Sequence, residues 1–347
     1  MRPRLGFLGV GWIGRNRLEA VARSRVADIV AVADPSPENA KAAAGVVPCQ
    51  AVESLEELLA LNLDGLVIAT PSALHAEQAR TALEHGVAVF CQKPLGRTAA
   101  ETLEVVRTAR RENRLLGVDL SYRFVEGARR IRQLVQAGEL GSVYAADLTF
   151  HNAYGPDKPW FYDPILSGGG CVIDLGIHLV DLALWVLEGV SVSSVTSHLF
   201  AKGKPLTGRE SEVEDFALAD LELSSGAVVR LACSWNLPAG CDAVIQTTFF
   251  GDAGGASLSN VNGSFYDFVA ERFRGTARER LCSPPDDWGG RAIVDWATRL
   301  TAAVGYDPSV ERLVEVAGVL DAIYGRDLQL RLQSDPPTPA LVQAGLP

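Results

Sequence analysis

The chain has 347 residues, of which 48% are hydrophobic and 21% charged, a composition typical of globular rather than disordered proteins. This length exceeds one ordinary core and favours two domains. The formal net charge of -10 gives the protein as a whole no attraction to nucleic acid or acidic membranes, so we expect neither as a partner.

The chain carries few signs of targeting. Its six cysteines are scattered without any C-x-x-C pair, which favours unpaired thiols in a reducing compartment, the cytoplasm. The first residues faintly imitate a signal peptide, but glycines interrupt the apolar run, so we do not expect secretion. No apolar run approaches the roughly 20 residues needed to cross a bilayer, and we expect no membrane segment.

Strand-like and helix-like segments alternate over the first third of the chain. The strand-like runs are apolar on both faces, as in a buried parallel sheet. This alternation predicts an α/β Rossmann domain with a doubly wound parallel sheet over residues 1–122. Its expected strands are 5–8, 29–33, 65–69, 87–91 and 115–118, and its expected helices are 13–24, 37–44, 55–61, 73–85 and 99–112.

The texture changes after about residue 122. Along residues 217–223 one face of the expected strand is apolar and the other is more polar, and residues 224–226 have the composition of a hairpin turn. We therefore expect an α+β domain with an open, mostly antiparallel sheet over 123–347. An amphipathic helix at 309–324 is a candidate to pack back on the first domain. The expected strands are 142–152, 192–200, 215–223, 227–235 and 244–250.

A glycine motif, G-x-G-x-x-G, follows the first strand and opens the first helix. Gly9 permits a tight turn, Gly11 lets a ligand approach the backbone, and Gly14 lets helix and strand pack closely. The unpaired N–H groups of the helix would then face an anion. The motif predicts a dinucleotide site, and the alternative is a glycine turn without a ligand.

An acidic residue at the end of the second strand bears on the choice of cofactor. Asp34 follows Gly14 by 20 residues, and its carboxylate can accept hydrogen bonds from the ribose 2′-hydroxyl while repelling a 2′-phosphate. No basic residue occurs between Asp34 and Lys41. The pattern favours NAD over NADP. The alternative is that Asp34 caps a helix, helped by Pro35.

Lys93 follows the apolar strand 87–91 and therefore lies at the carboxyl end of a sheet strand, where open α/β sheets bind ligands. Its ammonium group could hydrogen-bond a substrate hydroxyl and stabilise developing alkoxide charge. The alternative is an ordinary surface lysine.

A glycine triplet, 168–170, leads into a segment that is apolar except for a line of ionisable residues. Asp174, His178, Asp181 and Trp185 share one helical face. Asp174 and His178 are one turn apart, close enough for the carboxylate to orient the imidazole. The alternatives are a satisfied core network and a metal site. We expect no metal, because no second histidine stands at a suitable spacing from His178.

These motifs, in this order, resemble the Gfo/Idh/MocA family, which includes glucose–fructose oxidoreductase and inositol dehydrogenase. Residues 9–14 are similar to the family's fingerprint, and 70–75 resemble its T-P-x-x-x-H segment. Residues 92–94 resemble its E-K-P signature, and 168–181 match its G-G-G-x-x-x-D-x-G-x-H-x-x-D run. The resemblance covers nearly the whole chain.

The resemblance implies a catalytic trio. His178 would act as general acid–base at the substrate hydroxyl, Lys93 would assist by hydrogen bonding, and Asp174 would support the pair. The family usually has glutamate where this chain has Gln92, and a neutral amide cannot stabilise charge on Lys93, so we expect altered tuning of the lysine. The implied cofactor-binding residues are Gly9, Gly11, Trp12, Ile13, Gly14, Asp34, Thr70, Pro71, Ser72, His75, Gln92 and Lys93.

Further residues are candidates for contacting the substrate, besides Asp174 and His178. Arg123 stands where the family often has an Asn/Arg-containing segment. Polar and aromatic residues before the glycine triplet suit a polyhydroxylated ring, because aromatic faces stack on C–H groups while polar groups fix hydroxyls. These residues are His151, Asn152, Trp160 and Tyr162, and the alternative for the aromatic ones is ordinary packing.

Together these features lead to one functional hypothesis and two rivals. The hypothesis is an NAD-dependent oxidoreductase acting on a secondary alcohol of a cyclic sugar, sugar derivative or cyclitol. The rivals are a glycosidase that uses bound NAD for transient oxidation and a non-catalytic regulatory protein that senses NAD. We also expect a homodimer or homotetramer formed through the second sheet, because exposed sheet faces seek cover.

Overall fold

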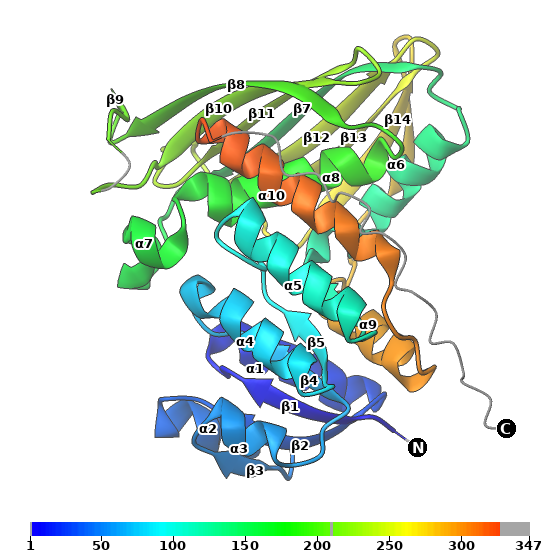
Figure 1. The fold of residues 1–347 in the computed structure, drawn as a ribbon. Helices are drawn as coiled ribbons and strands as arrows, with labels where there is room; N and C mark the ends of the chain where they lie inside the picture. Colours follow the sequence, from blue (N-terminus) through cyan, green and yellow to red (C-terminus); the bar gives the residue numbers. More distant parts are fainter. Residues whose placement is uncertain (1, 209–210, 327–347) are drawn as a thin grey trace, which may run out of the picture.

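The computed structural model describes residues 2–208 and 211–326, and the first part of this region builds a six-stranded parallel sheet (Figure 1). The strand order β3-β2-β1-β4-β5-β6 is that of a dinucleotide-binding, doubly wound sheet. The predicted Rossmann fold is therefore confirmed. The strands are β1 (Arg4–Leu8), β2 (Asp28–Ala33), β3 (Gln50–Val52), β4 (Gly65–Ile68), β5 (Ala88–Cys91) and β6 (Leu116–Val118).

Helices cover both faces of this sheet. The core on one face includes Leu18 of α1 and Ala43 of α2, and the core on the other includes Leu58, Leu83 and Val106 of the next three helices. This is the arrangement that right-handed crossovers between parallel strands produce. The helices are α1 (Trp12–Ser24), α2 (Pro37–Ala44), α3 (Leu55–Leu59), α4 (Ser72–Glu84) and α5 (Ala99–Arg111).

A helix from the other end of the chain completes one of these faces. α9 (Arg291–Thr301) packs against α1, and its Trp296 is 2% exposed, with the ring centroid 5.7 Å from that of Phe90. An added Cβ at Gly65 or Gly117 would come within 2.6 or 2.7 Å of the indole. Glycine at these two positions therefore leaves the space that the indole fills.

The second sheet has nine strands, in the order β15-β14-β13-β12-β7-β11-β10-β8-β9. Among the described strands of this second sheet, only β7 and β11 pair in parallel, so the predicted open, mostly antiparallel sheet is confirmed. The strands are β7 (Val143–Asn152), β8 (Val192–Ala201), β9 (Lys204–Pro205), β10 (Phe216–Leu223), β11 (Val228–Ser234), β12 (Ala243–Gly251), β13 (Gly255–Asn260), β14 (Phe268–Arg274) and β15 (Ala277–Cys282).

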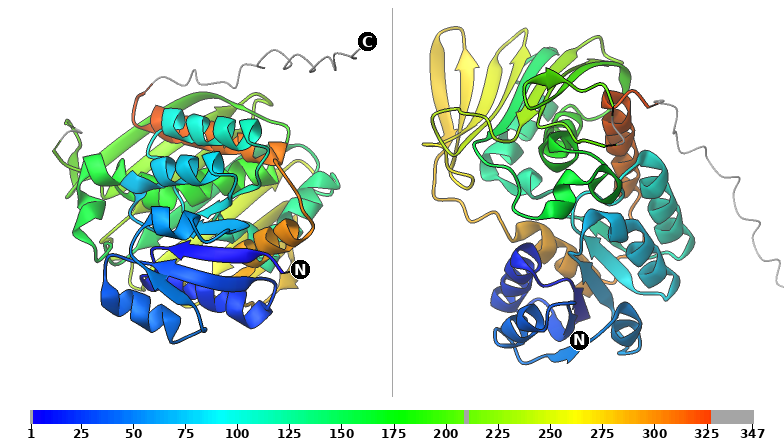
Figure 2. Two further views of the ribbon diagram at one scale, coloured as in Figure 1. Left: turned by 60° about the horizontal axis from the view of Figure 1, so that its bottom comes forward. Right: turned by 90° about the vertical axis from the view of Figure 1, so that its left-hand side faces the viewer.

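In the part of the chain that the structure describes, helices cover only one face of this second sheet, as Figures 1 and 2 show. α10 lies between α8 and α5, and Asp321 of α10 accepts a hydrogen bond from the N–H of Ala99 at 2.8 Å, so this helix also contacts the first domain. The remaining helical segments are η1 (Ser121–Phe124), α6 (Glu126–Gln136), η2 (Pro159–Tyr162), α7 (Pro164–Ser167), η3 (Val172–Gly176), α8 (Ile177–Val186), η4 (Pro308–Glu311) and α10 (Arg312–Ile323).

Strands β13, β14 and β15 lie outside the predicted set. β13 is made of small and polar residues, and its neighbours give it a buried position that its own sequence does not indicate. β15 is an edge strand whose charged side chains are mostly exposed, which hides the usual alternation of apolar and polar residues. The expected hairpin turn at 224–226 is present, with Gly226 at a φ of 85°.

The expectation that no apolar segment reaches membrane-spanning length was wrong for one stretch. Pro164–Val186 is 23 residues long with a mean hydropathy of 1.6 in its most apolar window. However, 89% of that window is buried inside the protein. It is therefore accounted for as the core helix of the second domain, whose apolar surface is covered by the sheet and by its neighbouring helices.

Candidate active site

The glycine motif forms a tight turn between β1 and α1. Gly9 has a φ of +83°, and an added Cβ there would lie 2.6 Å from the carbonyl oxygen of Ala69. At Gly14 a Cβ would lie 2.1 Å from the carbonyl oxygen of Gly9, whereas at Gly11 it would meet no atom within 4 Å. Two glycines are thus needed for packing, and the middle one borders open space where a ligand can approach the backbone.

Two helices that begin beside this space lack a side-chain cap. α1 begins after Gly11 and α4 begins after Pro71, and neither has a capping side chain or an acidic residue in its first turn. By contrast, α2, α3 and α5 are capped by Ser36, Ser54 and Thr98. Uncapped N–H groups at a helix N-terminus bind anions, so these residues fit the pyrophosphate of a dinucleotide.

Asp34 connects the glycine turn to the end of β2. Its carboxylate accepts hydrogen bonds from the N–H of Val10 at 2.7 Å, the N–H of Ser36 at 2.9 Å and the side-chain amide of Asn39 at 3.1 Å. The alternative that Asp34 caps α2 is wrong, because Ser36 occupies the capping position. Asp34 instead holds the shape of the turn.

A cavity of about 860 Å³ lies between the two domains, next to these helix starts. This volume is within the range of small-molecule and cofactor sites. Segments from both domains line it, and they include Tyr122, Tyr266 and Trp288. The sequence-predicted residues that line it are Gly11, Trp12, Ile13, Thr70, Pro71, Ser72, His75, Gln92, Lys93, Trp160, Asp174 and His178.

Lys93 and Asp174 meet across this cavity from different domains. The lysine Nζ donates to the carboxylate Oδ1 of Asp174 at 2.5 Å and to its carbonyl oxygen at 2.7 Å. The other carboxylate oxygen accepts from the indole Nε1 of Trp235 at 3.0 Å. The Lys93 and Asp174 side chains are only 19% and 16% exposed, so solvent screens this pair weakly.

His178 lines the same cavity and is 8% exposed. Its ring centroid lies 4.9 Å from that of Tyr122 and 6.4 Å from that of Phe150. Burial lowers the pKa of His178 well below its usual value, and the positive charges of Lys93 and Arg17 lower it further. Its Nδ1 has no hydrogen-bond partner among the described residues. The imidazole is therefore neutral and not held by a protein acceptor.

The expected support of His178 by Asp174 differs from what the structure shows. The Asp174 carboxylate bonds to Lys93 and Trp235, and no hydrogen bond joins it to His178 among the described contacts. Asp174 lies in η3, a π-helical turn, which adds a residue per turn and changes the i, i+4 alignment of a regular α-helix. Asp181, also in the predicted line, pairs with Arg123.

Glu214 is a functional candidate that the sequence did not reveal. It is 1% exposed and accepts hydrogen bonds from the N–H groups of Gly170 at 3.0 Å and Val172 at 2.9 Å and from the hydroxyl of Tyr324 at 2.7 Å. A carboxylate in this place satisfies the start of the helical segment that carries Asp174. No local sequence pattern connects positions 170 and 214.

Several predicted site residues lie elsewhere. Gly9, Gly14 and Asp34 shape the turn without lining the cavity, and Arg123 forms an ion pair with Asp181 outside it. The other three are substrate candidates that the structure does not bring to the cavity, because their side chains lie against strands or a neighbouring loop: His151, Asn152 and Tyr162.

Comparison with known proteins identifies the chain's relatives. Residues 4–120 match the model described as an oxidoreductase family with an NAD-binding Rossmann fold, and residues 128–257 match the Gfo/Idh/MocA C-terminal domain. The chain belongs to the Gfo/Idh/MocA family of oxidoreductases. Its N-terminal domain is thus of the NAD-binding type, in agreement with the open space at Gly11 and the uncapped start of α1.

Two curated relatives of this Gfo/Idh/MocA protein differ in how much of their length aligns with the chain. D-glucoside 3-dehydrogenase of Escherichia coli K12 is 32% identical over 211 residues, which is 58% of this chain and 60% of that protein. Rhizopine catabolism protein MocA of Rhizobium meliloti is 29% identical over 86% of this chain and 95% of that protein. The aligned region thus spans less than two thirds of the first of these proteins and nearly all of the second.

Solved structures of low sequence identity share the fold. Levoglucosan dehydrogenase in complex with NADH has a TM-score of 0.81 at 20% identity, covering 94% of this chain and 96% of that one. GenD2 from gentamicin A biosynthesis, in complex with NAD, has a TM-score of 0.77 at 22% identity, covering 93% of each chain. Both domains of the Gfo/Idh/MocA fold are therefore present here in the same arrangement.

The described residues of this Gfo/Idh/MocA protein contain no group of three or more histidine, cysteine, aspartate or glutamate side chains that could hold a metal ion. His75, the other buried histidine near the cavity, contacts the carbonyl oxygens of Pro94 and Thr70, each at 2.7 Å. It joins the loop that carries Lys93 to the turn after β4, which is a structural role.

The lowered pKa of His178 predicts a pH effect on stability. Near pH 6.5 the unfolded chain takes up a proton that the folded chain does not, so the free energy of unfolding falls below about pH 6.5, by up to about 1.4 kcal/mol per pH unit. The free energy of unfolding, measured with urea at several pH values, should change less steeply with pH in His178→Asn than in the wild type. The exposed His198→Asn is the matched control, and equal slopes in all three proteins would contradict the expectation.

Proposed function

We propose that this protein is an NAD-dependent dehydrogenase or reductase that acts on a secondary alcohol or ketone of a cyclic sugar, sugar derivative or cyclitol. The observation that carries the proposal is the meeting of Lys93 and Asp174, 2.5 Å apart, in a cavity shared with His178 and with two uncapped helix starts. The names of relatives such as D-glucoside 3-dehydrogenase and inositol 2-dehydrogenase support the substrate class.

His178 is the proposed general acid–base. As a neutral imidazole, it accepts the hydroxyl proton when the alcohol is oxidised and returns a proton when the ketone is reduced. Since Nδ1 lacks a partner among the described residues, no protein acceptor fixes the proton on one nitrogen. When bound, the nicotinamide ring accepts or returns the hydride.

Lys93 is the proposed donor to the substrate oxygen. An ammonium group has three N–H donors, and Asp174 receives two of them through its carbonyl and carboxylate oxygens. The third has no acceptor among residues 2–208 and 211–326 and can stabilise negative charge that develops on the reacting oxygen. Asp174 orients the lysine through two hydrogen bonds, and Trp235 holds Asp174 in turn.

Aromatic walls suit a ring-shaped substrate. Trp160 lines the cavity and stacks on Phe161 with ring centroids 3.8 Å apart, and Tyr122 and Trp288 line the cavity with centroids 5.0 Å apart. Flat apolar faces such as these bind the C–H faces of a sugar ring, while Lys93 and His178 contact a hydroxyl.

The proposed cofactor is NAD rather than NADP. Asp34 lies at the end of β2 with its carboxylate bonded to the glycine turn, and no basic residue occurs before Lys41 to balance a 2′-phosphate. A carboxylate at this place repels the additional phosphate of NADP.

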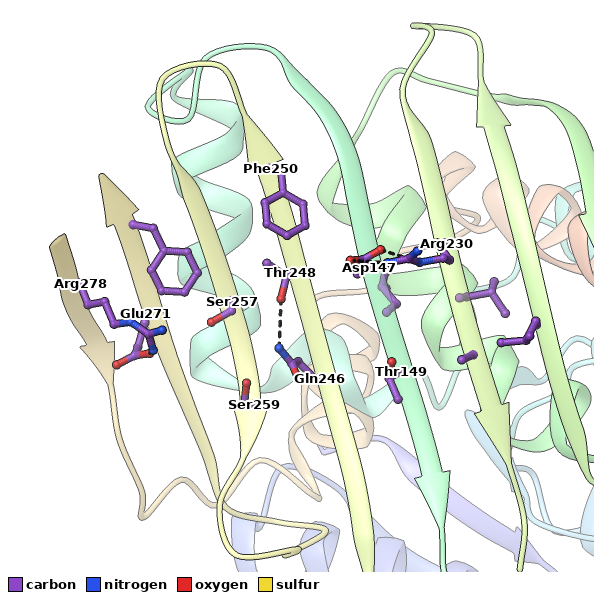
Figure 3. Close-up of a pocket in the computed structure, with 15 residues that line it drawn as sticks. Asp147, Thr149, Arg230, Gln246, Thr248, Phe250, Ser257, Ser259, Glu271 and Arg278 are labelled. Atoms are coloured by element: carbon purple, nitrogen blue, oxygen red, sulfur yellow. Dashed lines mark hydrogen bonds and ion pairs between the residues drawn. The ribbon is translucent and has the colours of Figure 1, made fainter. Parts of the chain in front are cut away.

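The proposed assembly is a second copy of the chain bound to the uncovered face of the nine-stranded sheet. Figure 3 shows this face, which carries polar side chains such as Thr149 and Gln246 as well as Phe250 and an Asp147–Arg230 ion pair. Leu218, which is 38% exposed, adds an apolar contact. A surface of mixed polar and apolar side chains such as this can pair with its own copy about a two-fold axis.

The function is tested by incubating the protein with inositols and aldoses, with NAD or NADP, and following the absorbance of the reduced cofactor. We expect turnover of at least one polyol and faster turnover with NAD than with NADP. Release of free sugar from glycosides without net NADH would support the glycosidase, and cofactor binding without turnover would support the sensor. Faster turnover with NADP would overturn the proposed cofactor.

Replacing Lys93 tests the mechanism. Lys93→Ala should lower kcat by about 10²-fold or more, because the transition state loses a charged hydrogen-bond donor. Lys202→Ala, which breaks an exposed ion pair with Glu212, is the matched control and should leave kcat near the wild-type value. An unchanged kcat for Lys93→Ala would remove this residue from the mechanism.

The assembly is tested by light scattering coupled to size-exclusion chromatography. We expect the wild type to be a dimer or tetramer and Leu218→Arg to shift it toward the monomer, because a charge would be buried at the contact. Leu74→Arg changes an equally exposed leucine on α4 and should not alter the mass. A monomeric wild type would refute the proposed assembly.

A further inference from the structure

Gln92 is the residue at which this chain departs from the E-K-P signature, and its side chain belongs to a hydrogen-bonded cluster. The amide Nε2 of Gln92 donates a short hydrogen bond to the Oδ2 of Asp119. The same Oδ2 accepts from the Nε of Arg17 at 2.5 Å, and the other carboxylate oxygen accepts a short bond from the hydroxyl of Ser121. Arg17 also donates to that hydroxyl at 3.1 Å.

This cluster of Arg17, Gln92, Asp119 and Ser121 is buried and electrically neutral. The side chain of Asp119 is 0% exposed and that of Arg17 is 11% exposed. A carboxylate without solvent is tolerated only beside an opposite charge and with its oxygens hydrogen-bonded, and both conditions are met here. The neutrality depends on a single acidic group facing a single guanidinium.

Gln92 fits this cluster because it is an amide. Its N–H groups can donate to Asp119, whereas a glutamate in the same conformation would bring two carboxylate oxygens into contact. Two such groups would compete for Arg17, and one would remain protonated. A glutamine at 92 and an aspartate at 119 are therefore complementary. The signature glutamate would carry its negative charge at position 92, and in this chain Asp119, after the neighbouring strand, carries one instead.

The cluster lies at the wall of the cavity, between the cofactor turn and Lys93. Arg17 is on α1, which starts at the glycine turn, and Gln92 immediately precedes Lys93. Asp119 and Ser121 follow β6, where the chain crosses to the second domain. All four residues line the cavity, so the charge of Asp119 acts on what binds there.

We propose that Asp119 is a positioning residue whose carboxylate, which balances Arg17 and accepts from Gln92, provides the negative group near the nicotinamide that the signature residue does not carry in this chain. The proposal rests on the proposed function, because it requires the nicotinamide to bind near Lys93. The oxidised nicotinamide is a cation and the reduced form is neutral. Because the Asp119 carboxylate balances the positive charge of Arg17, its presence sets the relative affinity for NAD⁺ and NADH.

The test compares the wild type with Asp119→Asn and with the double variant Gln92→Glu/Asp119→Asn, which moves the acid to position 92. Dissociation constants for NAD⁺ and NADH are measured by fluorescence titration, without substrate. Asp119→Asn leaves Arg17 unbalanced, so we expect the ratio of affinities to shift toward NADH by about tenfold. The double variant restores one negative charge and should return most of the shift.

Two further variants keep the test decisive. Gln92→Glu alone adds an acid, so we expect the opposite shift toward NAD⁺, larger at about pH 9 than at pH 7 because adjacent carboxyl groups lose their last proton late. This variant reports on the cluster even if Asp119→Asn does not fold, which thermal unfolding would reveal. Asp64→Asn removes a charge at the opposite end of the same sheet and should leave the ratio unchanged.

The outcomes separate this inference from the proposed function. Affinity ratios that are equal in all variants, or a double variant no closer to wild type than Asp119→Asn, would overturn the role of Asp119. We also expect kcat to fall by about tenfold in Asp119→Asn and to recover in the double variant. A wild type that binds both cofactor forms but oxidises no polyol would overturn the proposed function alone, and one that binds neither form would overturn both.

Discussion

The ion pair between Lys93 and Asp174 is the interaction on which the site depends. It joins the loop after β5 to the π-helical turn before α8, so it connects the cofactor domain to the sheet domain at the place where a substrate would react. Further hydrogen bonds hold the segment that carries each partner. His75 fixes the loop of Lys93, and Trp235 and Glu214 fix the segment of Asp174. Neither domain alone contains both groups.

The buried and half-buried charges that line the cavity all have an oppositely charged partner. Lys93 faces Asp174, Arg17 faces Asp119, and His178 is neutral because burial and the nearby cations disfavour its charged form. A low-dielectric site can hold several ionisable groups only when each charge has a partner. The proposed substrate, a neutral polyol, is compatible with such a site, because it brings hydrogen-bonding groups without adding a charge that would need a new partner.

Much of the fold and part of the site could be predicted from the sequence, and the difference follows from the range of the interactions. The glycine turn and the uncapped start of α1 depend on residues within one short segment, so their pattern is visible locally. The spacing from Asp174 to His178 was also local, but the π-helical turn altered its meaning. Asp119 and Arg17 are 102 positions apart, and Glu214 lies 44 positions from Gly170, so only the folded chain brings them together. His151 and Arg123 have suitable chemistry, yet neither lines the cavity. His151 hydrogen-bonds to Ser234 on a neighbouring strand, and Arg123 forms an ion pair with Asp181.

The packing of Trp296 over Gly65 and Gly117 affects the order in which the protein can mature. The hydrophobic layer on one side of the cofactor domain is closed by a helix that follows the whole second sheet in the chain. While the ribosome is still extending the second sheet, Phe90 and its neighbours lack this cover, and the nascent domain exposes a wide apolar strip. The cofactor domain is therefore expected to be complete only after α9 has been synthesised, and a fragment that ends at the crossover to the second domain would tend to aggregate.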